Sequence, residues 1–267
     1  SSDVCSSDLA NFYPAYASET MAKDGPSGKA HVESSKDESI IDDVKSGLRK
    51  ADNAIRNTAE DIKAFFVGDE GGGNLEPVVI YKNFTAHGMI DQPVLNSQGK
   101  EIAKLKDIII NQDGNAILAV VSDGGVLGIG DKLAAFDYSQ VVAQRSDGKV
   151  VMSLTQNMID KAADFSYDRN DRANAKVIPL ESYSVNDILD GELLDSKGDD
   201  AGVIENLSFD NGRADRVVVG FDKMMGMGGK LAALNYSSLK KIRQSGEVDL
   251  QMNDGQSDQF ANFSKQT

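Results

Sequence analysis

The side chains that most often carry chemistry are scarce in this chain. It has two histidines, His31 and His87, and one cysteine, Cys5. A zinc site or a histidine-based acid–base pair needs several such groups close together, and neither histidine has another histidine or a cysteine near it in the sequence. No catalytic, cofactor-binding or metal-ligating residue is therefore assigned, and the chain is expected not to be an enzyme.

A glycine-rich stretch, Gly124-Gly125-x-x-Gly128-x-Gly130, is the strongest candidate for a binding loop. It lacks the Lys-Ser/Thr ending of a nucleoside triphosphate loop and does not open a helix as a dinucleotide fingerprint would. Its glycines are better explained by a sharp bend between two strands. A methionine-rich stretch stands at the matching place later in the chain, where flexible thioethers fill a core gap or form an adaptable surface. The candidate partner-contact residues are Val126, Leu127, Ile129, Met224, Met225 and Met227.

Two acidic stretches have a faint resemblance to calcium loops. They are Asn111–Asn115 and Asp195–Asp200. Neither has the carboxylate spacing and the closing glutamate of an EF-hand loop, and Asn, Asp and Gly clusters are typical of turns. Both stretches are interpreted as hairpin turns.

Charge and hydropathy exclude several classes of function. The 267 residues carry a net charge of −14, and residues 1–76 contribute 15 acidic and 8 basic side chains, a net −7. Binding to nucleic acid or to anionic lipid depends on clustered Lys and Arg, so neither is expected as a partner. No run of about 18 apolar residues is present, so no membrane span is expected in the chain as given.

The first 38 residues are expected to lie outside the fold. Residues 1–9 resemble a translated sequencing-adapter read and are interpreted as non-native, which leaves the chain without a native cysteine. Residues 10–38 are polar and are expected to be disordered. Ala15-x-Ala17 has the small-x-small form of a signal-peptidase site, so the expected location is extracytoplasmic (periplasmic), slightly favoured over cytoplasmic.

Residues 39–67 have the apolar spacing of an amphipathic helix. Apolar side chains recur at steps of three and four, and Ser39 and Gly68 are suited to the two ends. Two roles stay open for this segment: docking on the rest of the chain, or self-association as a helical pair. The glycines of residues 68–76 predict a flexible linker.

The remainder of the chain contains an internal repeat. Lys132-Leu-Ala-Ala135 and Tyr138-Ser139 return 98 residues later as Lys230-Leu-Ala-Ala233 and Tyr236-Ser237. Upstream the offset is 99, and the extra residue falls in a turn, Asn111–Gly114 against Asp210–Gly212. An internal repeat indicates two copies of one structural unit.

Each copy is predicted to be a small, mainly β unit. Short runs rich in branched apolar residues alternate with Gly, Asn and Asp, which is typical of strands joined by tight turns. In the first copy the strands are predicted at 94–95, 102–110, 117–121, 132–136, 141–142 and 150–152, with a short helix at 157–162. The fold class is therefore two tandem small antiparallel β-barrels with helical tails, at 77–168 and 182–267, joined by a linker at 169–181.

These residues resemble the PRC-barrel domain, which occurs in the photosynthetic reaction centre H subunit and in a ribosome maturation factor. The resemblance rests on residues 93–110, on Ala119-Val-Val121, on the stretch from Gly125 to Leu133 and on Phe165-x-Tyr167. It implies a bacterial protein-interaction or scaffolding module, with a protein partner or self-association. The alternatives are a sensor for a small ligand or metal, and a membrane-complex subunit related to the H subunit.

Overall fold

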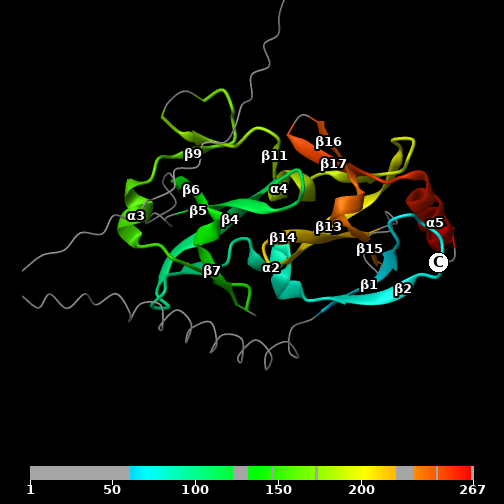
Figure 1. Cartoon of the computed structure of the whole chain (residues 1–267), viewed down its shortest axis with the longest axis horizontal. Coiled ribbons are helices and arrows are strands. Elements are labelled where there is room, and N and C mark those ends of the chain that lie inside the picture. The colour runs from blue at the N-terminus through cyan, green and yellow to red at the C-terminus, as the bar shows by residue number, and fades with distance from the viewer. Residues whose placement is uncertain are drawn as a thin grey trace, which may run out of the picture.

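The computed structural model of the chain describes residues 61–122, 132–145, 147–171, 174–220, 231–244 and 246–265. These residues form a mainly β structure in which two sheets lie next to each other along the long axis (Figure 1). The first sheet is drawn in green, and the second in yellow to red with cyan strands at its edge.

The first sheet has the order β6-β5-β4-β3-β8-β7, and β11 (Ser182–Ser184) pairs with β4 as a further strand. Short helical turns precede β3 and separate β6 from β7. The elements in chain order are η1 (Lys82–Phe84), α2 (Ala86–Met89), β3 (Pro93–Leu95), β4 (Glu101–Asn111), β5 (Ala116–Ser122), β6 (Leu133–Asp137), η2 (Tyr138–Gln140), β7 (Val141–Gln144) and β8 (Val150–Met152).

The second sheet has the same strand order, read from the opposite end. Its strands run β16-β17-β12-β13-β14-β15, which correspond to β7-β8-β3-β4-β5-β6, and they are followed by β1 and β2 at the β15 edge. The elements are α4 (Val185–Leu189), β12 (Glu192–Leu194), β13 (Asp200–Asp210), β14 (Arg213–Gly220), β15 (Leu231–Asn235), η3 (Tyr236–Ser238), β16 (Lys240–Gln244) and β17 (Glu247–Gln251), with β1 (Ile62–Val67) and β2 (Glu76–Ile80) before them in the chain.

Neither sheet closes into a barrel, so the expected closed antiparallel barrels are corrected in two respects. Both outermost strands of the first sheet, β6 and β7, are joined only through the turn η2 and do not pair with each other. In addition β3 pairs with β8 in parallel, and β12 pairs with β17 in the same way.

The predicted strands of the first copy are confirmed within one or two residues, and so is the short helix, which is α3 (Gln156–Lys161). The structure also explains why the two turns differ in length by one residue. Asn211 and Gly212 have φ of 49° and 76°, as a two-residue type I′ hairpin requires. The first copy has a longer turn, in which only Gly114 takes a positive φ of 85°.

The predicted helix at 39–67 is wrong at its C-terminal end. Residues 62–67 form β1, which pairs with β15 in parallel and with β2 in an antiparallel manner; residues 39–60 lie outside the described part of the chain. The run Ala64-Phe-Phe-Val67 suits a strand, and the open edge of β15 supplies hydrogen-bond partners that a helix would not use. Tertiary pairing thus overrides the helical spacing.

The glycine-rich segment is not a free linker either. Gly71, Gly72 and Gly73 have φ of 68°, 81° and 80°, a left-handed backbone that other residues rarely adopt. This turn lies against α5 (Asp254–Lys265), where the Gln259 amide donates to the Gly72 carbonyl at 2.9 Å and accepts from Gly68 N at 3.1 Å. Because β2 belongs to the second sheet, residues 77–80 fall outside the first unit.

The core is continuous through both sheets. One cluster of buried apolar side chains joins residues of the first copy, such as Ile108 and Val121, to residues of the second, such as Leu207 and Leu234. Each outer face carries a smaller cluster. On the first sheet, Phe165 of β9 (Phe165–Ser166) and Ile178 cover Val120. β9 pairs with β10 (Lys176–Val177), and β10 lies in the segment 169–181 that the sequence predicts to be a linker.

Candidate interaction cleft

The residues that the sequence singles out for partner contact lie outside the described residues. Val126, Leu127 and Ile129 stand between β5 and β6, and Met224, Met225 and Met227 stand between β14 and β15. These two connections occupy equivalent places in the two sheets, as the repeat predicts. Their role in partner contact stays a prediction.

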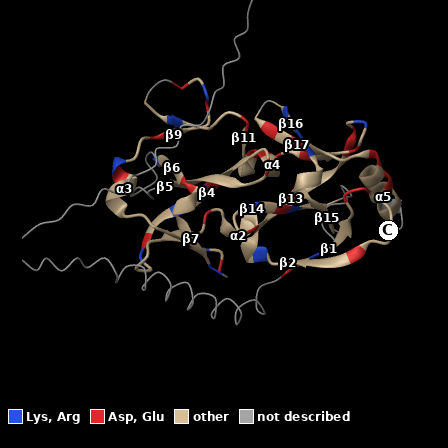
Figure 2. Ribbon diagram, viewed as in Figure 1, with Lys and Arg blue, Asp and Glu red and all other residues tan. Residues whose placement is uncertain are grey.

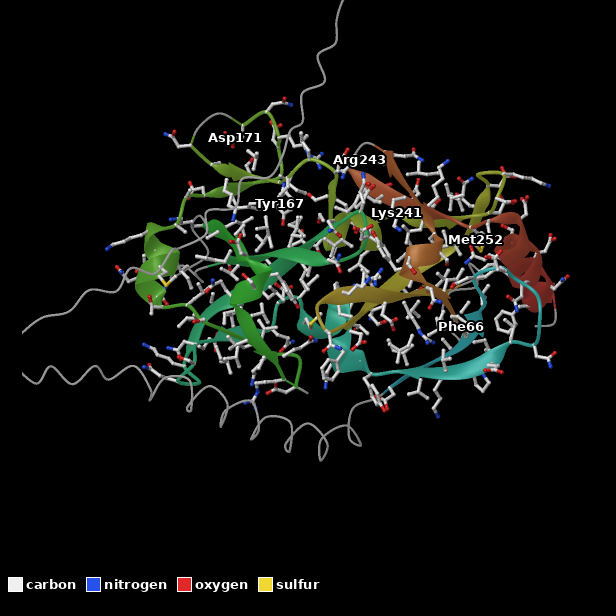
Figure 3. The ribbon with its side chains drawn as sticks, in the orientation of Figure 1. Phe66, Tyr167, Asp171, Lys241, Arg243 and Met252 are labelled. Carbon is white, nitrogen blue, oxygen red and sulfur yellow. The ribbon has the colours of Figure 1, made fainter. Side chains whose placement is uncertain are left out.

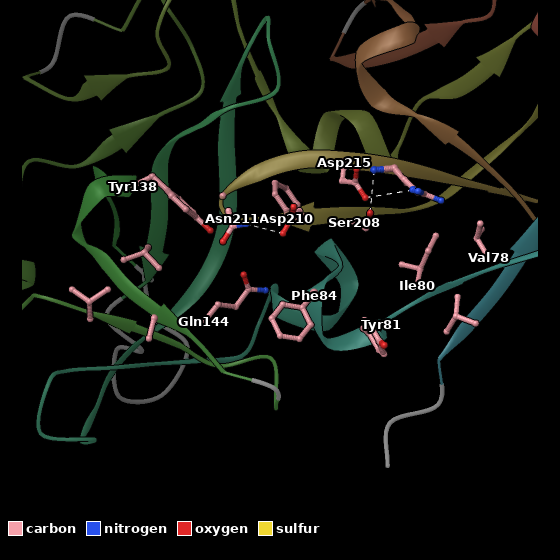
Figure 4. A pocket seen from close by; sticks show the side chains of 17 residues that line it. Val78, Ile80, Tyr81, Phe84, Tyr138, Gln144, Ser208, Asp210, Asn211 and Asp215 are labelled. Carbon is pink, nitrogen blue, oxygen red and sulfur yellow. Dashed lines mark hydrogen bonds and ion pairs between the residues drawn. The ribbon is translucent and has the colours of Figure 1, made fainter. Parts of the chain in front are cut away.

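A cleft lies between the two copies, lined by described residues of both. Its volume is about 1010 Å³. Figure 4 shows its walls, which come from three places: the end of β2 with η1, the strand β7, and the hairpin of β13 and β14. The apolar side chains that line it are Val78, Val79, Ile80, Phe84, Val141, Val142, Ala143 and Phe209.

The cleft is open because two sheet edges border it. β7 is the last strand of the first sheet, and β2 is the last strand of the second. Edge strands leave backbone N–H and C=O groups unpaired and available to another chain. Val79 is 56% exposed and Tyr81 is 41% exposed, so the wall formed by β2 presents apolar surface to solvent.

The charged groups of the cleft come from the second copy. Asp210 and Asp215 are exposed, and Arg216 is held near them. Its guanidinium lies 4.9 Å from the centre of the Phe66 ring and 3.5 Å from Asp215 Oδ2. Part of the Arg216 charge is thereby balanced, so the cleft is a groove of mixed polar and apolar lining with a mildly acidic rim.

The hairpin turn of the second copy, Asn211–Gly212, lines the cleft, and it is bound reciprocally to the hairpin turn of the first copy. Ala116 N donates to the Gly212 carbonyl, and Ala214 N donates to the Gly114 carbonyl, both at 2.8 Å. These bonds tie each copy's turn to the other copy's strand. The cleft therefore exists only while the two copies are joined.

Two tyrosines that the repeat conserves hold these turns in place. A Cβ on Gly212 would lie 2.8 Å from the Tyr138 ring, and a Cβ on Gly114 would lie 3.0 Å from the Tyr236 ring. Each tyrosine thus packs on the turn glycine of the other copy. Burial raises the pKa of Tyr138 to about 12, and it also raises the pKa of Tyr236. Both phenols stay protonated.

A second reciprocal contact joins the short helices to the long strands. Thr85 caps α2 and forms a bridge with Ser208 of β13, while Ser184 caps α4 and pairs with Ile109 of β4. Asn206 Oδ1 accepts from His87 N at 3.2 Å. The equivalent residue of the first copy, Asp107, accepts from the N–H groups of α4.

Asp107 is the most heavily coordinated side chain in this junction. It is fully buried; Ser184 Oγ donates to it at 2.6 Å and Tyr167 Oη at 3.0 Å. The backbone donors are residues 108, 185 and 186. Burial is the larger influence and raises the pKa of Asp107 to about 6, although each of these donors favours the charged form.

Basic side chains of both copies close the opposite side of the junction. Figure 3 shows Tyr167 and Arg243 there, from the first and second copy respectively. Arg243 lies 5.0 Å from the Tyr183 ring centre and donates to the Ser182 carbonyl, which also accepts from Arg169 at 3.1 Å. Arg243 thereby ties β11 to β16, and Arg169 ties β11 to the segment that follows β9.

The described residues contain no group of three or more His, Cys, Asp or Glu side chains that could hold a metal ion. His87 is exposed, and the bond to Asn206 uses its backbone rather than its ring. Figure 2 shows acidic and basic residues dispersed over the ribbon. Across the same part of the chain, no helix is long and apolar enough to cross a membrane.

Comparison with known proteins supports one part of the resemblance. Residues 82–155 match the PRC-barrel domain family, a range that begins at η1 and ends just before α3. The chain therefore contains one PRC-barrel domain, which is narrower than the range of 77–168 expected from the sequence. No curated protein matches the chain.

The sequence patterns alone do not reveal the residues that join the two copies beside the cleft. They mark Tyr138 and Tyr236 only as repeated residues, and the turn glycines only as turn formers. The signal that could have found them is their joint repetition: Gly114 and Tyr138 recur as Gly212 and Tyr236, both at an offset of 98. A glycine and an aromatic residue that repeat together, yet belong to different elements, suggest mutual packing between copies.

Proposed function

We propose that this chain is a non-enzymatic protein-interaction module built from two fused PRC-type units. The second unit would comprise residues 182–252, since β12–β17 have the same order as the strands of the PRC-barrel domain at 82–155. The observation that carries the proposal is the cleft between the units, which is bordered by two edge strands and lined by partly exposed apolar side chains.

A cleft holds a polypeptide segment better than a flat docking surface holds one. Apolar anchors in a desolvated groove provide most of the affinity in protein interfaces, and a polar rim sets the orientation. Val141, Ala143 and Phe84 supply the groove, and Asp210 and Asp215 supply the rim. The preferred partner is a segment with an apolar face flanked by Lys or Arg.

The test is quantitative affinity capture with three forms of the full chain. Val142→Arg places a charge in the cleft, and Val203→Arg places the same charge at a position on β13 that is 45% exposed and does not line the cleft. The expected result is a protein captured by the unaltered chain and by Val203→Arg, with capture by Val142→Arg reduced about tenfold or more. Equal capture by all three forms would contradict the proposal.

A small-ligand sensor is the second candidate, because about 1010 Å³ is also enough to enclose a drug-sized molecule. A thermal-shift screen of small metabolites and divalent ions distinguishes the two. Stabilisation by one compound that Val142→Arg abolishes and Val203→Arg retains would favour the sensor. The membrane-complex alternative has no supporting observation in the cleft.

A further inference from the structure

β2 is an edge strand whose open side presents apolar surface. It pairs with β1 along one side, and within the described residues no strand pairs with its other side. Figure 1 shows β2 along the margin of the second sheet. Val79 is 56% exposed and Tyr81 is 41% exposed. Because an open strand edge is a template for pairing with another strand, this edge is a candidate interaction surface.

Pro77 indicates which backbone groups of β2 point outward. Proline has no N–H to donate, so within a sheet it occurs where its nitrogen faces away from the neighbouring strand. The backbone groups of an antiparallel strand alternate in direction from one residue to the next, so Val79 shares the outward orientation of Pro77. The N–H and C=O of Val79 therefore stand at the centre of the open edge.

The same edge of a second copy fits this one in a single register. Two antiparallel β2 strands related by a two-fold axis at Val79 place the two Val79 residues opposite each other, where they exchange both N–H···O=C bonds. Pro77 of each copy then lies opposite Tyr81 of the other. The bond that Pro77 cannot donate is the one to the Tyr81 carbonyl, and that carbonyl already accepts from Phe84 N at 2.9 Å. The proline therefore removes no hydrogen bond from this register.

The side chains in this register are also complementary. The backbone stays extended through Tyr81, with φ of −71° and ψ of 112°, so Lys82 follows directly on the strand. Glu76 of each copy lies opposite Lys82 of the other, and both are exposed. Val78 lies opposite Ile80, and opposite charges and apolar pairs across strands both stabilise a sheet. A two-fold axis at Val78 would instead set Glu76 against Ile80.

The neighbouring charges do not oppose this pairing. Lys63 is the other charged side chain of β1 and β2. It lies opposite Val79 within its own copy, so both β2 strands separate it from its equivalent in the second copy. Asp61 precedes β1 and is therefore also one strand away from the pairing. The turn between β1 and β2 adds Asp69 and Glu70 at the acidic end of β2.

We propose that the open edge of β2 pairs with the same edge of a second copy of this chain, in an antiparallel, two-fold symmetric register centred on Val79. The second sheet of each copy then continues into that of the other. Strands of this length form a contact at the small end of specific interfaces, so the dimer is reversible and depends on protein concentration. This pairing does not depend on partner binding in the cleft.

The test is sedimentation equilibrium of the full chain at low ionic strength, from about 1 µM to about 1 mM. The unaltered chain is expected to pass from monomer to dimer within this range. Glu76→Lys sets lysine against lysine at both ends of the pairing, and Lys82→Glu sets glutamate against glutamate. Either change is expected to weaken the dimer about fivefold or more. A mixture of the two variants is expected to restore it, because every acid then faces a base.

A matched pair of arginine variants tests the centre of the register. Val79 is 56% exposed on the edge strand, and Val203 is 45% exposed on β13, which has a neighbour on each side. Val79→Arg sets two arginines opposite each other and is expected to weaken the dimer about tenfold or more. Val203→Arg is expected to leave it within about twofold. Thermal unfolding of both variants checks that they are folded.

Three results would overturn the proposal. They are a chain that stays monomeric over the whole range, a dimer that both arginine variants weaken equally, and a dimer that the mixture of Glu76→Lys and Lys82→Glu fails to restore. Val142→Arg alters the cleft at β7 and leaves the β2 edge unchanged, so it is expected to retain the dimer. Dimerisation can therefore fail while capture of a partner holds, and the reverse.

Discussion

At the scale of single residues, the two copies make an equivalent contact with different side chains. Asp107 and Asn206 occupy equivalent places on β4 and β13, and each accepts from the backbone at the start of the other copy's short helix. Asp107 receives two hydroxyl donors in addition, from Ser184 and Tyr167. The carboxylate therefore holds more of the junction together, at the cost of burying a charge.

The pH dependence of stability follows from the raised pKa of Asp107. Because its pKa is about 6 in the fold and about 4 in an unfolded chain, the folded state binds the extra proton between these values. Stability from this group is thus present at low pH and is lost as pH rises from about 4 to 6.5. Relative to Asp107→Asn, the unaltered chain is expected to lose about 2–3 kcal/mol across this interval.

Urea unfolding at pH 4 and pH 7 measures this difference for the two forms. Taking the difference removes the contribution of the other carboxylates, which the two forms share. A relative gain in stability of the unaltered chain as pH rises would show that the five donors outweigh burial, and would contradict the raised pKa.

The turn glycines are expected to be far less tolerant than other glycines with a similar backbone. Gly212→Ala has to fit a Cβ against the Tyr138 ring as well as to adopt a positive φ, and is expected to cost about 2–4 kcal/mol. Gly99 has a φ of 77° with no atom within 4 Å of an added Cβ, so Gly99→Ala is expected to cost only about 1 kcal/mol. Equal losses in thermal unfolding would show that the tyrosine contact contributes nothing.

At the scale of elements, the segment before the PRC-barrel domain completes the second sheet rather than the first. β1 and β2 extend the edge at β15, and the turn between them is fastened by α5, which comes from the other end of the chain. Phe65 of β1 lies 5.0 Å from the Phe263 ring of α5. The described part of the chain therefore begins and ends in the same structural layer.

A glycine in α5 provides a sharp test of this fastening. In an exposed helix, glycine to alanine usually stabilises by about 1 kcal/mol. Gly255 is different, because an added Cβ would collide with the Glu70 carbonyl, and Gly255→Ala is expected to lower the melting temperature. Asn262→Ala, at an exposed position of the same helix, is expected to leave it unchanged or raise it. A melting temperature raised by both substitutions would mean that the turn does not rest on α5.

Much of this element structure could be predicted from the sequence, because turn chemistry and apolar runs are local. Asn211 and Gly212 predict the hairpin of β13 and β14, and three branched or long apolar residues predict β8. The wrong prediction for residues 62–67 has a non-local cause. Their spacing is helical, and only the edge of β15, whose paired residues lie 167 positions later, makes a strand the better choice.

At the scale of the whole molecule, the repeat indicated two units but not how they meet. Two separate tandem domains and one fused body would have the same predicted strands and turns. The deciding contacts, Gly114 on Tyr236 and Gly212 on Tyr138, join elements about 75 or more residues apart, and no local pattern records such distances. The cleft could not be foreseen for the same reason, since its walls come from both units.

The central claim is that the two copies form one body, because the walls of the cleft come from both copies. Native-state hydrogen exchange, read by mass spectrometry, tests it most directly on peptides from β4–β5 and β13–β14. The expected result is the same highest opening free energy in both, reduced equally in both by Gly212→Ala. If one copy opened at lower free energy while the other kept its protection, the copies would be independent domains and the cleft would not be a built feature of the molecule.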